Sequence, residues 1–433
     1  MKKLLTFSIK TLGCKVNRYE SELLTENIKF LGLRQKTFPA SDIILINSCS
    51  VTQRTEAKMR NEIRKAAKVK NAQLIICGCM SQTLKEAIRN VNSARITTVD
   101  TPDKVKGVIK SICKHFSGKG RLEEKGMHSI LESFTGRTRA FIKIQDGCQS
   151  FCSYCIVPFM RPHIWSRDPD EIIAEILNME KSYTKEIVLT GIHIGRYQSE
   201  HYNLQSIINK IIQETRIPRI RLSSIEPLDI TDDLLRLMEC ETRVCPHLHI
   251  PLQSGSDSVL KKMNRAYSMQ EYRSLLRCIR MRIPDISITT DIIVGFPGEK
   301  ESDFEESMKA LQEFHFLKVH IFPFSARPGT KAFDMPDKLP QSTIMTRTKS
   351  LSDLSGRIAI EEKKKWLGKT ADVLFEQAVK NHPGFYKGFS QNYIKVIVKA
   401  KSTLTNRICR VTLTKLDTTG MLSGKILTCR FKK

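Results

Sequence analysis

The feature that most constrains the fold of this chain is an alternation of short apolar strands with amphipathic helices over residues 1–366. This alternation is typical of parallel sheets, because each helix returns the chain to the edge where the next strand begins. In residues 1–116 we expect strands at 4–9, 43–46, 74–76 and 96–99, and helices at 19–31, 55–69, 84–90 and 102–116. These elements predict an amino-terminal domain with an open, mostly parallel α/β sheet.

The same alternation resumes after residues 117–135, a stretch rich in glycine and charge that we predict to be a linker. Six further strands are expected at 141–144, 187–189, 220–223, 247–250, 286–293 and 319–322. Helices are expected at 170–181, 204–214, 231–239, 269–281 and 301–314, followed by one or two basic helices over 341–366. About six strand–helix units predict a partial, TIM-like β/α barrel over residues 136–366, with its active site at the carboxyl ends of the strands.

The last segment, residues 367–433, changes to short alternating strands at 371–376, 393–398, 407–414 and 424–429. Turn residues separate them, which predicts a small carboxyl-terminal β-barrel. Residues 399–433 carry nine lysines and arginines against one acid, Asp417. We therefore expect a basic, RNA-binding barrel, with Phe385 and Tyr393 in its core rather than stacked on bases.

Three cysteines, Cys148, Cys152 and Cys155, are spaced Cys-x3-Cys-x2-Cys directly after the first strand of the central domain. This spacing can aim three thiolates at one inorganic centre and leave one coordination position open, which chemistry at the centre requires. The alternative is a closed zinc knuckle completed by His163, which would serve only as a scaffold.

A second set of cysteines, Cys14, Cys49 and Cys79, follows three successive strands of the amino-terminal sheet. Because the carboxyl ends of parallel strands meet at one edge, the three can converge on a ligand. Alternatively each is a small buried residue, as free cysteines commonly are. Cys77 is the alternative to Cys79, but it belongs to an apolar strand and is expected to point into the core.

Polar residues and glycines gather at the carboxyl ends of the central strands. They are Thr190, Gly191, Glu226, Gln253, Ser254 and Gly295. We expect them to contact a cofactor, with Glu226 and Gln253 suited to ribose hydroxyls or an amino group, although each glycine could serve an ordinary turn. Three histidines flanked by apolar strand residues, His193, His247 and His249, are expected to be satisfied core groups rather than ligands.

The net charge of +26 would attract phosphate backbones, so nucleic acid is the expected partner, against the alternative of a merely soluble basic surface. The basic helix near 53–71 is expected to present a solvated face. No secretory signal or membrane-spanning run is visible, so we expect a cytoplasmic protein with free thiols. The remaining cysteines match no ligand spacing and are expected to pack: Cys113, Cys240, Cys245, Cys278, Cys409 and Cys429.

Several motifs resemble one known family. The Cys-x3-Cys-x2-Cys loop, with Tyr154 before its last cysteine, resembles the signature of radical S-adenosyl-L-methionine (AdoMet) enzymes. The segments Leu-Gly-Cys14-Lys-Val-Asn, Asn-Ser-Cys49-Ser-Val-Thr, Gly-Cys79-Met-Ser-Gln, His249-Ile-Pro-Leu-Gln-Ser-Gly-Ser and Ile-Ile-Val-Gly295-Phe-Pro-Gly-Glu are similar to those of the methylthiotransferases. Residues 15–20 and 189–193 look most like the branch that acts on threonylcarbamoyladenosine in tRNA.

The resemblance implies a function. Cys148, Cys152 and Cys155 would hold a [4Fe-4S] cluster that binds AdoMet, and Cys14, Cys49 and Cys79 an auxiliary [4Fe-4S] cluster. The implied reaction is methylthiolation of carbon 2 of N6-threonylcarbamoyladenosine at position 37 of a tRNA. The implied partners are the tRNA anticodon stem-loop, an electron donor protein such as flavodoxin or ferredoxin, and a sulfur donor. The carboxyl-terminal barrel resembles the RNA-binding domain commonly fused to the family.

Three alternatives remain open at this point. The same chemistry would suit isopentenyladenosine in tRNA or a ribosomal-protein side chain, and a zinc-stabilised RNA-binding protein would need no catalysis. One departure from the family also stands out after the central cysteines. Pro162 replaces a glycine and Trp165 an arginine, so the substrate contacts of this loop are open, and Trp165 is expected to pack rather than to stack on a base.

Overall fold

The computed structural model describes residues 4–91, 95–100, 104–117, 127–134 and 138–429. Its amino-terminal sheet has the order β2-β1-β3-β4-β5, and all of its paired strands are parallel. The strands are β1 (Thr6–Thr11), β2 (Arg34–Gln35), β3 (Ile43–Ser48), β4 (Gln73–Gly78) and β5 (Ile96–Val99), and the helices are α1 (Lys15–Phe30), α2 (Gln53–Ala67), α3 (Gln82–Arg89) and α4 (Lys104–Ser117). The predicted open α/β sheet is confirmed; the two-residue strand β2 was not expected.

The two faces of this sheet are covered by different helices. One apolar cluster joins α1 and α4 to the sheet, and the other joins α2 and α3 to its opposite face. Strands β3 and β4 are buried along their whole length, as expected of central strands in a sheet with helices on both sides. Both faces are thus occupied, and the carboxyl ends of β1, β3 and β4 remain as the place for a ligand.

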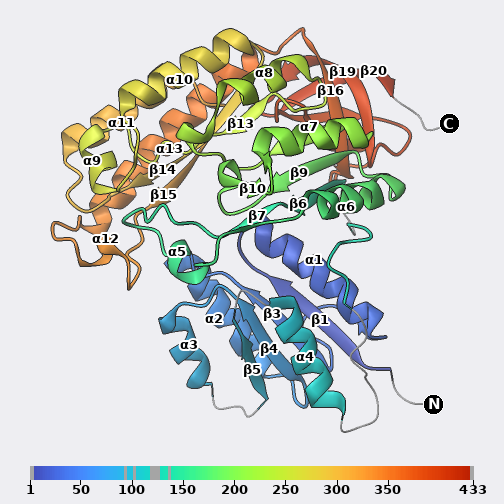
Figure 1. Ribbon diagram of the computed structural model, residues 1–433. Coiled ribbons are helices and arrows are strands. Elements are labelled where there is room, and N and C mark those ends of the chain that lie inside the picture. Colours follow the sequence, from blue (N-terminus) through green and yellow to red (C-terminus); the bar gives the residue numbers. More distant parts are fainter. Residues whose placement is uncertain (1–3, 92–94, 101–103, 118–126, 135–137, 430–433) are drawn as a thin grey trace.

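The central domain is an open barrel of six parallel strands (Figure 1). Parallel bridges from Ile220 to Val244 and from Ser224 to His249 join its two three-stranded sheets, so β6 and β15 are its free edges. The strands are β6 (Arg139–Lys143), β9 (Glu186–Thr190), β12 (Arg219–Leu222), β13 (His247–His249), β14 (Ser287–Val294) and β15 (Lys318–Pro323). The main helices are α6 (Pro169–Lys181), α7 (Leu204–Glu214), α8 (Asp232–Cys240), α10 (Met269–Arg282), α11 (Glu301–Phe314) and α13 (Gln341–Lys364).

Side chains alternate between the two faces of this sheet. Ile142, Ile187 and Leu222 point outward into the large core that also contains the helices. The opposite side, here called the inner face, carries Arg139, Glu186 and other polar residues. Short elements absent from the sequence prediction complete the domain: β7 (Gln145–Asp146), α5 (Val157–Met160), β8 (Trp165–Ser166), η1 (Ile194–Arg196), β10 (Gln198–Ser199), β11 (Tyr202–Asn203), η2 (Pro227–Asp229), α9 (Asp257–Lys262) and α12 (Lys331–Asp334).

The carboxyl-terminal segment is a closed five-stranded barrel, as predicted, in the order β16-β17-β18-β20-β19. Its strands are β16 (Thr370–Ala378), β17 (Phe385–Ser390), β18 (Lys395–Lys399), β19 (Arg407–Leu416) and β20 (Leu422–Cys429). The sequence prediction missed β17. This strand contains Gly388, whose backbone lies so close to β16 that an added Cβ would be 2.1 Å from the carbonyl oxygen of Leu374, and an interior glycine weakens a strand pattern.

The barrel covers the amino-terminal ends of the central strands. Arg219 donates hydrogen bonds to the carbonyl oxygens of Phe389 and Asp372, at 3.1 and 2.6 Å. Tyr393 lies in this interface: its ring is 4.5 Å from that of His247 and 5.0 Å from the guanidinium of Arg221. The prediction that Tyr393 fills the barrel core is therefore wrong, because the ring bridges two domains instead.

Two other expectations need correction. Cys409 and Cys429 form a disulfide because they are register partners on β19 and β20, so they are not separate packing residues with free thiols. Within the expected linker, residues 127–134 are described, and they pack rather than hang free: Leu131 is buried in the large core and its amide donates to Glu175 of α6. None of the described helices is both long and apolar enough to cross a membrane.

Candidate functional site

The amino-terminal cysteines converge as predicted. Cys14 caps the start of α1, Cys49 follows β3 and Cys79 follows β4, all at the same edge of the sheet. Gly13 has φ +106°, and an added Cβ there would be 2.5 Å from the Cβ of Cys49, so only glycine lets these loops meet. Burial raises the pKa of Cys49 to about 11, with the nearby Cys14 and Cys79 thiols contributing. Cys77 is fully buried in the core, as expected.

The central cysteines form a second group in the loop after β7. Burial, together with Cys152 and Cys148, raises the pKa of Cys155 to about 12. Gly147 holds the start of the loop, since an added Cβ would be 2.2 Å from the carbonyl oxygen of His163. This contact is made by the backbone of His163, and its side chain is exposed. The structure thus gives no support to a zinc knuckle closed by His163.

The spacing of the thiols tests which inorganic centre fits. His249, Asp291 and His320 form a compact group, because their ligand atoms all lie within 4.8 Å of one another. Among the described residues, no other group of three or more histidine, cysteine or acidic side chains meets this distance. Neither cysteine trio is that compact. Zn–S bonds of ~2.3 Å in a tetrahedron place sulfurs only ~3.8 Å apart. Both trios therefore fit a larger, multi-iron cluster better than a single zinc ion.

One trio borders a cavity of about 520 Å³. Cys148 and Cys152 line it, together with Glu226, one of the predicted cofactor residues. Glu226 is paired with Arg265, whose guanidinium also donates to the sulfur of Cys152 at 3.4 Å. Arg265 thus connects the cavity to the cysteine loop; it was missed in the sequence because an arginine in a loop carries no distinctive pattern.

The other predicted cofactor residues do not line this cavity. They are Tyr154, Thr190, Gly191, Gln253, Ser254 and Gly295. Tyr154 packs against an apolar cluster that contains Met263 and Phe296. An added Cβ on Gly295 would be 2.4 Å from Ile344 of α13, so the packing of α13 alone requires glycine there. These contacts give Tyr154 and Gly295 structural roles.

His193 corrects another expectation. It lines the cavity rather than filling the core, with its Nδ1 3.7 Å from the sulfur of Cys148 and its Nε2 2.5 Å from Asp229. Burial opposes protonation, but the hydrogen bonds to Asp229 and Cys148 outweigh it and raise the pKa of His193 to about 9. In contrast, His247 is buried as expected, and its Nε2 lies 3.1 Å from the Thr289 hydroxyl.

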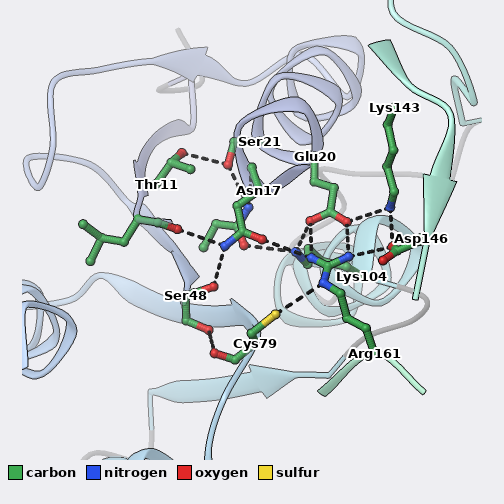
Figure 2. A network of polar contacts seen from close by, with 12 residues as sticks. Thr11, Asn17, Glu20, Ser21, Ser48, Cys79, Lys104, Lys143, Asp146 and Arg161 are labelled. Atoms are coloured by element: carbon green, nitrogen blue, oxygen red, sulfur yellow. Dashed lines mark hydrogen bonds and ion pairs between the residues drawn. The ribbon is translucent and has the colours of Figure 1, made fainter. Parts of the chain in front are cut away.

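A buried ionic network lies beside Cys79 and includes Asp146, which precedes the central cysteine loop (Figure 2). Arg161, just after α5, donates from Nη1 to Asp146 at 2.6 Å and to Glu20 of α1 at 3.0 Å. Lys143 on β6 lies 2.8 Å from Glu20, and Lys104 also contacts that carboxylate. Burial opposes ionisation of Glu20, but the three cations outweigh it and hold its pKa well below the usual range.

Arg161 also reaches the auxiliary trio, since its Nε donates to the sulfur of Cys79 at 3.4 Å. Asn17, next to the trio on α1, accepts from Arg161 at 3.1 Å. The described members of the network are three cations and two carboxylates, so an excess positive charge lies against the sulfur.

Comparisons with known proteins identify the family. The model of the radical SAM superfamily matches residues 142–311, and that of uncharacterized protein family UPF0004 matches residues 6–99. The threonylcarbamoyladenosine tRNA methylthiotransferase MtaB of Chlamydia pneumoniae is 36% identical over 427 residues, covering 98% of each chain. The chain belongs to the radical AdoMet tRNA methylthiotransferase family.

Other relatives of this methylthiotransferase carry two different names. MtaB of Bacillus subtilis is 35% identical, covering 95% of this chain and 94% of its own. A tRNA-2-methylthio-N(6)-dimethylallyladenosine synthase of Endomicrobium trichonymphae is 34% identical, covering 92% and 94%. Among solved structures, the radical AdoMet methyltransferase TsrM of Kitasatospora setae shares the fold, with a TM-score of 0.55 at 12% identity over 89% of this chain and 81% of that chain.

Family membership settles the class of chemistry. The methylthiotransferase is an enzyme that uses AdoMet and two [4Fe-4S] clusters, and it modifies tRNA. The non-catalytic zinc alternative is therefore wrong. The two cysteine trios, each too widely spaced for zinc, are the described groups that fit the two clusters.

Proposed function

We propose that this methylthiotransferase modifies carbon 2 of N6-threonylcarbamoyladenosine at position 37 of tRNA. Relatives named for this substrate match at 35–36% identity over 90% or more of the chain. The observation that carries the proposal is the contact of Arg161 with Cys79, which links the segment that follows the central cysteine loop to the amino-terminal cysteines. Two cysteine groups on domains held together in this way suit the insertion of sulfur into an unreactive C–H bond.

Each trio has a proposed role. Cys148, Cys152 and Cys155 would hold the cluster that binds AdoMet, and Cys14, Cys49 and Cys79 the auxiliary cluster. When bound, these groups supply a 5'-deoxyadenosyl radical, which removes the hydrogen from carbon 2, and the methylthio group that replaces it. Glu226, fixed by Arg265 at the wall of the cavity, would accept hydrogen bonds from the ribose hydroxyls of AdoMet.

The chain's own residues would hold the site together and keep it dry. Arg161 and Glu20 are buried between the two domains, so their ion pair would hold the domains together and exclude water beside Cys79. His193, held by Asp229, would orient the Cys148 thiolate through its Nδ1. Trp165 is 40% exposed beside this loop, with the Lys143 ammonium 5.0 Å from its ring, so a face remains free to stack on a base.

The proposed partners follow from the same surfaces. The basic barrel would bind the anticodon stem-loop, and a small redox protein such as flavodoxin or ferredoxin would deliver electrons. A sulfur donor would supply the sulfur atom that is inserted. We propose that the enzyme works in the cytoplasm, where its tRNA substrate is found.

Nucleoside mass spectrometry of tRNA from cells lacking the protein tests the substrate. Loss of the methylthiolated threonylcarbamoyladenosine, restored by the intact gene but not by a Cys148→Ala variant, is the expected result. Loss of methylthiolated dimethylallyladenosine instead would assign the chain to the chemistry named for the Endomicrobium relative. Retention of both nucleosides in the absence of any redundant enzyme would refute the proposal.

A further inference from the structure

Three neighbouring strands of the central sheet bring a compact group of side chains together on the inner face. His249 ends β13, Asp291 lies in β14 and His320 lies in β15, and these strands pair side by side (Figure 1). Asp291 and His320 are register partners. His249 is the register partner of Thr289, which precedes Asp291 by two residues. Because alternate residues of a strand share a face, the three side chains lie on the same face of the sheet.

The ligand atoms of this group are close enough to share one metal ion. One atom from each residue lies within 4.8 Å of the other two, and the Nε2 of His249 is 3.3 Å from a carboxylate oxygen of Asp291. Ligands bound at ~2.0–2.1 Å to a tetrahedral zinc ion lie ~3.4 Å apart. The side chain of His320 is exposed and has room to close the remaining distance. Two imidazoles and one carboxylate thus have the spacing of a three-ligand metal site.

Other parts of the protein do not occupy these ligand atoms. Among the residues that the structure describes, the ring of His320 and the carboxylate of Asp291 make no hydrogen bond. Within the same residues, His249 is the one basic side chain within 4.0 Å of that carboxylate. His249 is itself 16% exposed, so it is not the fully buried core group that the sequence predicted. The group is therefore open to an ion from solvent.

A hydroxyl group fixes the ring of His249. The Oγ1 of Thr289 lies 2.9 Å from the Nδ1 of His249, where it can accept the N–H of that nitrogen. The Nε2 then carries a lone pair, and it is the nitrogen that lies beside Asp291. Histidines that bind metals almost always donate their second ring nitrogen to such an oxygen, which sets the orientation of the ring. Strand β14 thus supplies both one ligand and the support of another.

We propose that His249, Asp291 and His320 bind one divalent transition-metal ion. Two imidazoles and a carboxylate suit zinc and iron(II). The group contains none of the six cysteines, so it is a metal site separate from the two clusters. Three protein ligands leave at least one coordination position for water or for an oxygen atom of a bound molecule.

Zinc K-edge X-ray absorption tests this site, because it reports the ligands of zinc without interference from the iron of the clusters. The full-length, cluster-reconstituted enzyme is supplied with one equivalent of zinc under anaerobic conditions and then desalted. We expect one zinc ion per chain, with nitrogen and oxygen ligands at ~2.0–2.1 Å and no sulfur at ~2.3 Å. His320→Ala and Asp291→Asn should each raise the Kd for zinc, measured by competition with a chelator, by about a hundredfold.

Controls separate the metal site from the fold and from the cysteines. His382→Gln, a change at an exposed histidine between β16 and β17, should keep the native Kd for zinc. Iron content and the melting temperature of the zinc-free protein should match the native values in His320→Ala, because this side chain is exposed. Sulfur among the zinc ligands, loss of the zinc on desalting, or a native Kd in both His320→Ala and Asp291→Asn would overturn the inference.

Discussion

The Nε of Arg161 donates a hydrogen bond to the sulfur of Cys79 at 3.4 Å, across a sequence separation of 82 residues. Both side chains are buried, and the same guanidinium binds Glu20 and Asp146. One arginine of the AdoMet domain thus holds the amino-terminal domain and touches a cysteine that we propose as a ligand of the auxiliary cluster. On that proposal, the contact between the domains and the electrostatic environment of the cluster depend on the same residue.

Replacing Arg161 by alanine should weaken both functions. Glu20 and Asp146 would lose a buried partner, so we expect the free energy of unfolding to fall by about 3 kcal/mol in denaturant titrations. Loss of a positive hydrogen-bond donor should also lower the reduction potential of the auxiliary cluster, measured by potentiometric EPR. Arg273→Ala, which removes a surface ion pair with Glu313, is the matched control and should cost less than about 1 kcal/mol. Equal effects of the two substitutions would contradict the role of Arg161.

Cys77, in β4, and Cys79, directly after β4, offer a matched pair. Cys79→Ala should remove the auxiliary cluster, and iron and sulfide analysis should show half the native content. Cys77→Ala should keep both clusters and lower the stability by about 1 kcal/mol, because its thiol fills the core. The opposite outcome would mean that the ligand assignment must be exchanged.

Glu226→Gln tests the AdoMet cavity. The amide keeps the size of the side chain but loses the charge that pairs with Arg265 and would attract ribose hydroxyls. We expect the Kd for AdoMet, from calorimetry under anaerobic conditions, to rise about tenfold with the iron content unchanged. Glu306→Gln on the exposed side of α11 should leave the Kd at the native value. An unaltered Kd in Glu226→Gln would remove this residue from the site.

His247 predicts an acid sensitivity of the interface between the central domain and the barrel. Burial and Arg221 hold its pKa well below its ordinary value of 6.5. Below pH 6.5, His247 is protonated in the unfolded chain but stays neutral in the folded chain. The free energy of unfolding therefore keeps its full value above this pH and declines as the pH falls. The contribution is up to about 1.4 kcal/mol per pH unit. In His247→Gln, the unfolding free energy measured from pH 7.5 to 5 should decline less steeply; parallel curves would show that His247 is not responsible.

Much of the fold follows from local pattern. The strands β3, β4, β9 and β12 appear within two residues of their predicted ends, because apolar runs bounded by turns specify buried strands directly. The edge strand β2 and the barrel strand β17 were missed: β2 is two exposed residues, and β17 contains a glycine that serves a close backbone contact. The prediction for Tyr393 failed because a strand pattern can show that a side chain is buried, but it does not show which domain the side chain packs against.

The six cysteines could be proposed as ligands from sequence because each lies within a few residues of a strand end, and parallel topology alone brings strand ends together. No such local rule connects Arg161 to Cys79 or His193 to Cys148. Those relationships arise when separate domains and loops pack, and packing depends on the shape and charge of whole surfaces rather than on spacing along the chain. The sequence thus determined which centres this enzyme can hold. The tertiary structure decided which side chains from distant parts of the chain lie beside the cysteines, as Arg161, His193 and Arg265 do.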